Sequence, residues 1–289
     1  MSASIQKSTI VRIFHALERL APALGARWAE QLWFSVPGGR QVRRAAPPPD
    51  RRFTAGDVAA ESWGDGPIVY LMHGWGGQRT DLDALVAPLV ASGHRVVSFD
   101  APSHGESAPG PSGPHRSTIL EFAAALRAVV AAEGPAHAII AHSLGCIGAT
   151  FALADGLRTE RLAFFAPMGA ASEYTHEFAR RLGFGERIRT RLVARIERRF
   201  GQPMSHFSVA ARIRDIASPP PLLIVHDQDD AETPWAGSAA LAEIWPDPSL
   251  LTTSGLGHRR VLRDAAAVAE AVSFVAAPAL TPDRAPKGH

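Results

Sequence analysis

The chain has 289 residues, a net charge of +2 and 46% hydrophobic residues. This length allows one large domain with an insertion, and so small a net charge does not predict binding to nucleic acid. The single cysteine, Cys146, excludes an intramolecular disulfide and a cysteine-based zinc site. No apolar stretch is long enough to cross a bilayer, and the N-terminus lacks the apolar core of a secretory signal. We therefore expect a cytoplasmic globular protein, with no cofactor and no bound metal.

Residues 1–50 are predicted to form one or two amphipathic helices followed by a proline-rich loop. Apolar residues recur there at helical spacing, with an interruption near Pro22, and Pro47 to Pro49 mark the loop. The apolar stripe could pack on the protein's own body, or it could bind a membrane surface or a partner subunit. Glu18 and Glu30 dilute the cationic face that membrane-binding helices carry, which favours packing on the body.

Residues 51–167 and 219–276 are predicted to form an α/β core in which strands alternate with helices. The expected strands are Ile68 to Met72, Arg95 to Phe99, the run ending at Ser143, Leu162 to Phe165, Leu222 to Val225 and Leu250 to Thr253. The expected helices are Asp81 to Ser92, Ser117 to Ala132 and Arg259 to Val275. This alternation predicts a mostly parallel sheet with helices on both faces. In such sheets the functional groups lie in the loops that follow the strands.

Residues 168–218 interrupt the alternation with a helical, arginine-rich insertion. The insertion contains ten arginines and five acidic residues. Its place between two strands favours a basic helical cap over an active site, whereas the arginines alone are equally expected on a solvated helical surface. In a cap, they would favour substrates that carry carboxylate or phosphate, or that are presented on an anionic lipid surface. Residues 277–289 are expected to be a disordered tail.

Ser143 is the strongest candidate nucleophile, although its pentapeptide is not unique. A small residue, any residue, Ser, any residue and Gly follow one another three times, around Ser62, Ser103 and Ser143. Ser62 precedes the turn Gly64 to Pro67, and Ser103 follows Pro102 and leads into a loop. Only Ser143 has a predicted strand before it and a predicted helix after it. A sharp turn between strand and helix exposes a hydroxyl above the sheet edge, beside the positive end of the helix.

Four motifs in one order resemble the α/β-hydrolase superfamily. They are His73 to Gly77, Asp100 to Ser107, the turn at Ser143, and His226 to Pro234 followed by Gly257-His258. The resemblance covers about residues 53–275 and implies the α/β-hydrolase fold with a helical cap, in a serine esterase or lipase-like member. One departure is Ala141, where the family usually has glycine, and its small side chain should preserve the turn. The loop from Asp100 to Ser107 is mainly structural in the family, so Asp100 and His104 receive no catalytic role.

The resemblance implies a triad in the chain order Ser, acid, His. His258 is chosen as the base from 12 histidines because it follows the last predicted strand in a glycine-rich loop. Among the acidic residues of His226 to Pro234, the family's motif selects Asp230, with Asp229 as the alternative. The acidic loop could also bind a metal, but no matching cluster of His and Asp supports that interpretation.

Acyl transfer also requires donors for the tetrahedral oxyanion. The backbone N–H groups of Leu144 and, by similarity to related hydrolases, of Trp75 are predicted to supply them. His73 is predicted to hold the loop of Trp75 by hydrogen bonding. The candidate substrate-binding side chains are Trp75, His142, Phe178, Phe184 and Phe207.

The function expected from this triad is hydrolysis of a carboxylic ester through an acyl-enzyme, with a small acyl compound as substrate. The same triad serves thioesterases, amidases, carbon–carbon bond hydrolases and acyltransferases, and sequence order does not separate them. A hypothesis of another class is a non-catalytic binding or membrane-associated protein, which would use the N-terminal helices and the cap as its working surface.

Overall fold

The computed structural model describes residues 2–38 and 44–278. Within these ranges eight strands form one sheet, in the order β1-β2-β4-β3-β5-β6-β7-β8. The six strands from β4 to β8 in this order are parallel, whereas β2 pairs antiparallel with both β1 and β4. The mostly parallel α/β sheet predicted from the sequence is confirmed. The strands are β1 (Arg51–Ala55), β2 (Val58–Trp63), β3 (Ile68–Met72), β4 (Arg95–Phe99), β5 (Ala136–His142), β6 (Thr159–Phe165), β7 (Leu222–Asp227) and β8 (Pro248–Thr253).

The β1–β2 hairpin at one edge of the sheet was not expected from the sequence. The turn between its strands contains Gly56, whose φ of 60° lies in the left-handed region that glycine adopts readily. Strand β2 is buried along its whole length although it contains Glu61, because Arg44 and Arg79 form ion pairs with that carboxylate. Alanines and a buried charge produce no apolar run, so the sequence pattern does not reveal this strand.

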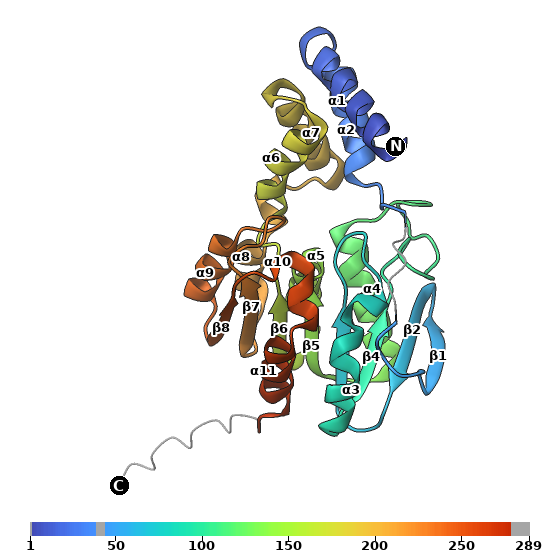
Figure 1. Ribbon diagram of the computed structural model, residues 1–289, viewed down its shortest axis with the longest axis vertical. Coiled ribbons are helices and arrows are strands. Elements are labelled where there is room, and N and C mark those ends of the chain that lie inside the picture. The colour runs from blue at the N-terminus through green and yellow to red at the C-terminus, as the bar shows by residue number, and fades with distance from the viewer. Residues whose placement is uncertain (1, 39–43, 279–289) are drawn as a thin grey trace.

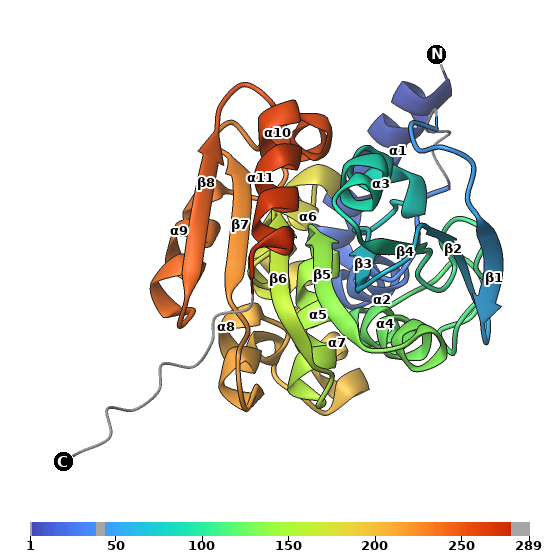
Figure 2. The ribbon, with the colours of Figure 1, turned by 90° about the horizontal axis from the view of Figure 1, so that it is seen from below.

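Helices cover both faces of the sheet, as predicted (Figure 2). One face carries α3 (Asp83–Ala91) and α11 (Ala265–Ala276), and the other carries α4 (Ile119–Glu133) and α5 (Leu144–Ala154). Alternate residues of β3 serve the two layers: Val69 and Leu71 pack with α3 and α11, and Tyr70 and Met72 pack with α4 and α5. Helix α9 (Trp235–Ile244), which was not expected, packs beside β7 and β8. Two buried faces explain why the central strands are continuous apolar runs.

The insertion expected at residues 168–218 is helical and lies between β6 and β7. Its α-helices are α6 (Ala171–Leu182), α7 (Glu186–Phe200) and α8 (Val209–Arg212). An antiparallel bridge between Ala170 and Ser208 closes its base. Because α6 follows the end of β6 directly, α6 and α7 stand above the carboxyl ends of the strands (Figure 1).

The N-terminal helices α1 (Ser2–Leu20) and α2 (Pro22–Trp33) pack against this insertion (Figure 1). Glu18 accepts hydrogen bonds at 2.9–3.1 Å from three N–H groups at the start of α7, those of Gly185, Arg187 and Ile188. A carboxylate at a helix N-terminus is stabilised by the helix dipole. Glu30 accepts a hydrogen bond of 2.5 Å from Arg195 of α7. The two acidic residues that dilute the cationic face therefore both hold the insertion.

Apolar contacts complete the packing of α1 and α2 on the insertion. Phe14 stacks on Trp28 with ring centroids 4.4 Å apart and also touches Phe184. Most of the apolar stripe is covered in this way, whereas Leu20 and Leu24, at the corner between the two helices, are 84% and 57% exposed. We call α1, α2, α6 and α7 together the helical roof. None of the described helices is long and apolar enough to span a bilayer.

The single helix expected over Arg259 to Val275 is wrong, because the chain breaks there. Helix α10 (Gly257–Arg260) and a short 3₁₀ helix (Val261–Arg263) precede α11. The break occurs at Asp264, whose carboxylate accepts the N–H of Ala267 and caps α11. Of the tail expected at 277–289, residues 279–289 lie outside the described residues, while Arg161 binds the carbonyls of Ala277 and Pro278.

Candidate active site

Ser143 lies on a strained turn between β5 and α5. Its φ of 53° and ψ of −122° are unusual for a residue with a side chain. The N–H of Ser143 is held by the carbonyl of Phe165, 3.0 Å away. Close backbone approaches surround the turn, since a Cβ added to Gly74 would lie 2.8 Å from the Cβ of Ser143, and one added to Gly145 would clash with the carbonyl oxygen of His73. Only glycines at these two positions allow the turn to close against the end of β3.

Asp230 and His258 form a buried pair, although 28 residues separate them in the sequence. Nδ1 of His258 lies 2.7 Å from Oδ2 of Asp230, and both residues are 8% exposed. A carboxylate accepts hydrogen bonds, so Nδ1 carries the proton. In the neutral ring Nε2 is then unprotonated, which is the tautomer that a general base requires.

The carboxylate of Asp230 is held by further donors that the sequence did not identify. Oδ2 also accepts hydrogen bonds from Nε2 of His226 at 3.1 Å and from the hydroxyl of Thr233 at 2.9 Å. Oδ1 accepts the N–H groups of Glu232 and Thr233 at 2.7 and 3.0 Å. Burial alone would raise the pKa of Asp230, but the hydrogen bonds from His226 and His258 outweigh it and hold that pKa well below its usual range. Asp230 therefore stays a carboxylate and its orientation is fixed.

Asp227, the last residue of β7, and Asp229 hold the loop that carries His258. Asp227 accepts hydrogen bonds from the hydroxyl of Thr253 at 2.7 Å and from the N–H of Leu256 at 3.0 Å. Asp229 is exposed and accepts the N–H of Gly255 at 2.8 Å. Asp230 is thus the aspartate that contacts His258, and Asp229, the alternative acid, supports the backbone of the same loop.

Two buried histidines brace the loop that contains Trp75. Nε2 of His73 accepts the N–H of Ala101 at 2.9 Å, so Nδ1 carries the proton and donates to the carbonyl of Gly74 at 2.7 Å. Nε2 of His104 accepts the N–H of Gly76 at 3.1 Å, and its Nδ1 donates to the carbonyl of Pro102. His73 thus holds its loop by hydrogen bonding, as predicted. Both rings must stay neutral to accept these N–H groups.

Because both histidines are buried in the neutral form, we expect the protein to lose stability as the pH falls below about 6.5. Burial lowers the pKa of His73 to about 4 and that of His104 to about 3, so the unfolded chain takes up protons first. Their contribution to the free energy of unfolding is complete above a pH of about 6.5, the pKa of histidine in the unfolded chain. It is lost as the pH falls toward the pKa values of the folded protein. From these two histidines we expect urea unfolding at pH 5.5 to show about 3 kcal/mol less stability than at pH 7.5. In His104→Gln this loss should shrink by about 1 kcal/mol, whereas the exposed His176→Gln should keep it; an unchanged loss in His104→Gln would contradict the assignment.

His142 lies beside both His258 and Ser143. Its Nε2 donates to the backbone carbonyl of His258 at 3.0 Å, and the two rings have centroids 4.7 Å apart. Burial, with a smaller effect from His258, lowers the pKa of His142 well below its ordinary value. His142, predicted to bind substrate, therefore also positions the main chain of the candidate base.

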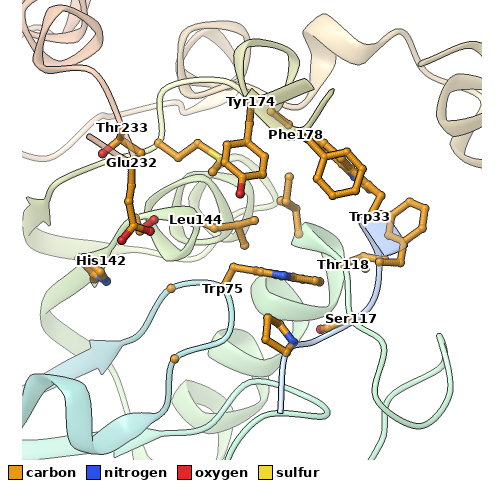
Figure 3. Close-up of a pocket in the computed structure, with 18 of the residues that line it drawn as sticks. Trp33, Trp75, Ser117, Thr118, His142, Leu144, Tyr174, Phe178, Glu232 and Thr233 are labelled. Atoms are coloured by element: carbon orange, nitrogen blue, oxygen red, sulfur yellow. The ribbon is translucent and has the colours of Figure 1, made fainter. Parts of the chain in front are cut away.

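A cavity of about 640 Å³ opens between the sheet and the helical roof (Figure 3). Ser143 and His258 both line it, as do Trp75 and Leu144. Leu144 is the first residue of α5, and N–H groups in the first turn of a helix have no partner within the helix. The structure thus brings the candidate nucleophile, base and oxyanion donors to one cavity, which has the size typical of small-molecule sites.

Four of the five predicted substrate-binding residues line this cavity, namely Trp75, His142, Phe178 and Phe207. Phe184 does not line the cavity, so the prediction that Phe184 binds substrate is corrected. The ring of Phe184 is buried against Phe14 of α1 and Phe178, with centroids 5.1 and 5.9 Å away. The sequence gave no sign that α1 would cover this ring.

Several lining residues were missed because distant segments supply them. The chain after α2 runs antiparallel to residues 115–117, with the N–H of Ser117 bonded to the carbonyl of Phe34. This contact places Trp33, Phe34, Ser117 and Thr118 in the lining, together with Tyr174 of α6 (Figure 3). The described residues contain no group of three or more His, Cys, Asp or Glu side chains that could hold a metal ion.

The sequence profile of the alpha/beta hydrolase family matches residues 68–271. Among solved structures, the chain is similar to a bromoperoxidase from Bacillus anthracis, with 16% identity, a TM-score of 0.59 and coverage of 78% of this chain and 98% of that one. It is similar to a monoacylglycerol lipase from Paleococcus ferrophilus, with 19% identity, a TM-score of 0.55 and coverage of 76% and 98%. A membrane phospholipase A, described as a bacterial virulence factor, has 14% identity, a TM-score of 0.58 and coverage of 94% and 96%. No curated protein matches the sequence. At these identities the likeness to solved structures establishes the fold alone.

Proposed function

Because the chain belongs to the alpha/beta hydrolase family, we propose that it is a serine hydrolase that cleaves a carboxylic ester. The main support is the pair of His258 and Asp230, 2.7 Å apart, whose His258 lines the same cavity as Ser143. Two of the similar structures are named as enzymes of ester hydrolysis, a monoacylglycerol lipase and a phospholipase A. These names favour an ester over the other bonds that the same residues can cleave.

In the proposed reaction the hydroxyl oxygen of Ser143 adds to the ester carbonyl, and Nε2 of His258 takes the hydroxyl proton. The N–H groups of Trp75 and Leu144 stabilise the negative charge on the carbonyl oxygen, at about 3 kcal/mol each. The bond to the alcohol oxygen then breaks, and His258 returns the proton to that oxygen, which leaves an acyl-enzyme. Water, deprotonated by His258, hydrolyses the acyl-enzyme and releases the acid and the free serine.

The second function considered is that of a binding or membrane-associated protein without turnover. The exposed Leu20 and Leu24 of the helical roof favour a contact surface there. However, five hydrogen bonds orient the Asp230 carboxylate, counting that from His258. A protein without catalysis has no physical need for this arrangement, so we favour the hydrolase.

A fluorophosphonate probe distinguishes the two functions, because it reacts with an activated serine. We expect stoichiometric labelling of the folded protein, loss of labelling in Ser143→Ala, and unchanged labelling in Ser103→Ala, whose serine has the same pentapeptide spelling. Absence of labelling in the wild-type protein would reject the hydrolase. A series of p-nitrophenyl esters, tested beside an amide and a thioester of one acyl group, would then identify the bond.

A further inference from the structure

The lining of the cavity changes character from one end to the other. Trp33 of α2 lies at one end, where Phe178 meets its ring edge-on at 5.1 Å and Tyr174 lies 5.9 Å away. Glu232, Thr233 and His142 lie at the opposite end (Figure 3). The aromatic end is suited to an apolar chain, because burying apolar surface is favourable and non-directional.

Four arginines line the cavity as well: Arg181, Arg259, Arg260 and Arg263. Nε of Arg259 lies 3.5 Å from the carboxylate of Glu232, which places this arginine at the polar end. Arg181 is held by Glu177 at 2.5 Å and by the hydroxyl of Tyr174 at 3.2 Å, so α6 presents it from the roof. The other three arginines follow His258 in the sequence and lie in α10 and the 3₁₀ helix after it, both of which contact β7 of the core.

Two of these arginines, Arg260 and Arg263, have no carboxylate partner among the described residues, whereas Arg259 pairs with Glu232 and Arg181 with Glu177. The only carboxylates among the lining residues are Asp81 and Glu232, and Asp81 accepts the N–H of Gln78 in the turn that begins a 3₁₀ helix. Arg260 donates to the carbonyl of Gly255, and no described residue binds the guanidinium of Arg263. An unpaired guanidinium at a cavity wall favours a carboxylate or phosphate of a ligand.

The arginine-rich insertion is not the source of this charge, contrary to what its composition indicated. Of its ten arginines, Arg181 alone lines the cavity. Others serve the structure: Arg195 binds Glu30 of α2, and Arg189 binds Glu186 within α7.

The proposed reaction assigns the two parts of the substrate to different ends of the cavity. His258 must return a proton to the departing alcohol, so the alcohol leaves on the side of His258, which precedes Arg259 and Arg260. The acyl carbonyl instead faces the N–H groups of Trp75 and Leu144, and its chain extends toward the aromatic end. We propose, on the premise of the hydrolase function above, that the substrate joins an apolar carboxylic acid to an alcohol that carries an anionic group.

Three decanoyl esters with different alcohols test this proposal: glycerol, which is neutral, glycerate, which carries a carboxylate, and glycerol phosphate. We expect kcat/KM for at least one anionic ester to exceed that of the neutral ester about tenfold at low ionic strength, and the excess to fall as salt is added. The carboxylate and phosphate arms identify which anion is preferred. Equal kcat/KM for the three esters would overturn the proposal while leaving the hydrolase intact.

The double variant Arg260→Gln, Arg263→Gln tests the assigned residues. We expect the ratio of kcat/KM for the anionic ester to that for the neutral ester to fall about fivefold or more. Arg214→Gln is the matched control. Arg214 is an exposed arginine, as Arg260 and Arg263 are, but it does not line the cavity. Its ratio should equal that of the wild-type protein. An unchanged ratio in the double variant would overturn the assignment.

A binding measurement separates this proposal from the reaction itself. Ser143→Ala is titrated by calorimetry with decyl phosphate and with the neutral decyl ether of glycerol, each below its micelle concentration. We expect an anionic ligand to bind about tenfold more tightly than the neutral ether, and the Arg260→Gln, Arg263→Gln changes to remove most of this difference. If no ester is hydrolysed but this binding preference is found, the proposed ligand class is supported and the proposed hydrolase function is rejected. Equal affinities would overturn the ligand class.

Discussion

Asp230→Asn is expected to lower kcat by about four orders of magnitude while leaving the fold intact. The carboxylate accepts the Nδ1 proton of His258 at 2.7 Å and so fixes the base tautomer. An asparagine amide can donate to Nδ1 instead, which would move the ring proton to Nε2 and leave no base facing the serine. Single-turnover kinetics with a p-nitrophenyl ester measure the loss directly, and circular dichroism checks that the variant is folded.

Asp229→Asn is the matched control for this prediction. Asp229 lies next to Asp230, is exposed, and accepts the N–H of Gly255, a bond that an asparagine oxygen can also accept. We expect its kcat to stay within about threefold of the wild-type value, since exposed polar contacts of this kind contribute little. Near-normal turnover in Asp230→Asn, or a large loss in Asp229→Asn, would reverse the assignment of the acid.

Gly145→Ala is expected to destabilise the protein by about 3 kcal/mol or more. Helix α5 passes so close to the end of β3 that an added Cβ would clash with the carbonyl of His73 and lie 3.1 Å from that of Met72. Both obstacles are backbone atoms of a buried strand end, which cannot move aside cheaply. The helix would have to shift and take the turn at Ser143 with it. Urea denaturation and fluorophosphonate labelling should therefore both report the change.

Gly237→Ala separates this steric effect from the ordinary preference of helices for alanine. Gly237 lies in the first turn of α9, has no heavy atom within 4 Å of an added Cβ, and keeps a negative φ. Alanine there should be neutral or stabilise the protein by up to about 1 kcal/mol. Similar destabilisation by both substitutions would show that the tight contact at Gly145 is not the cause.

Much of the fold was predictable because its signals are local. The strands β3, β4, β5 and β7 are short apolar runs between turns, and the chain alternates between them and helices. The placing of Ser143 was also local, since only that serine has a strand before it and a helix after it. By contrast, β2 could not be predicted, because it contains the charged Glu61. The burial of that carboxylate depends on Arg44 and Arg79, which are distant from it in the sequence.

The supporting residues of the site could not be read from the sequence. His226 lies near the end of β7 and Thr233 in the polar loop after it, and their bonds to Asp230 exist because that loop folds back against the end of the strand. The base was found from its glycine-rich surroundings, but its contact with His142 joins residues 116 positions apart. Long-range contacts of this kind leave no periodic pattern in the sequence.

The sequence by itself determined the alternating α/β order, the turn at Ser143 and the candidate order of serine, acid and histidine, since each rests on residues close together in the chain. Only the tertiary structure decided which aspartate contacts His258, that the N-terminal helices form part of the roof, and which arginines line the cavity. The physical reason is that neighbouring residues set backbone conformation, whereas a cavity is lined by side chains that packing brings together from distant segments.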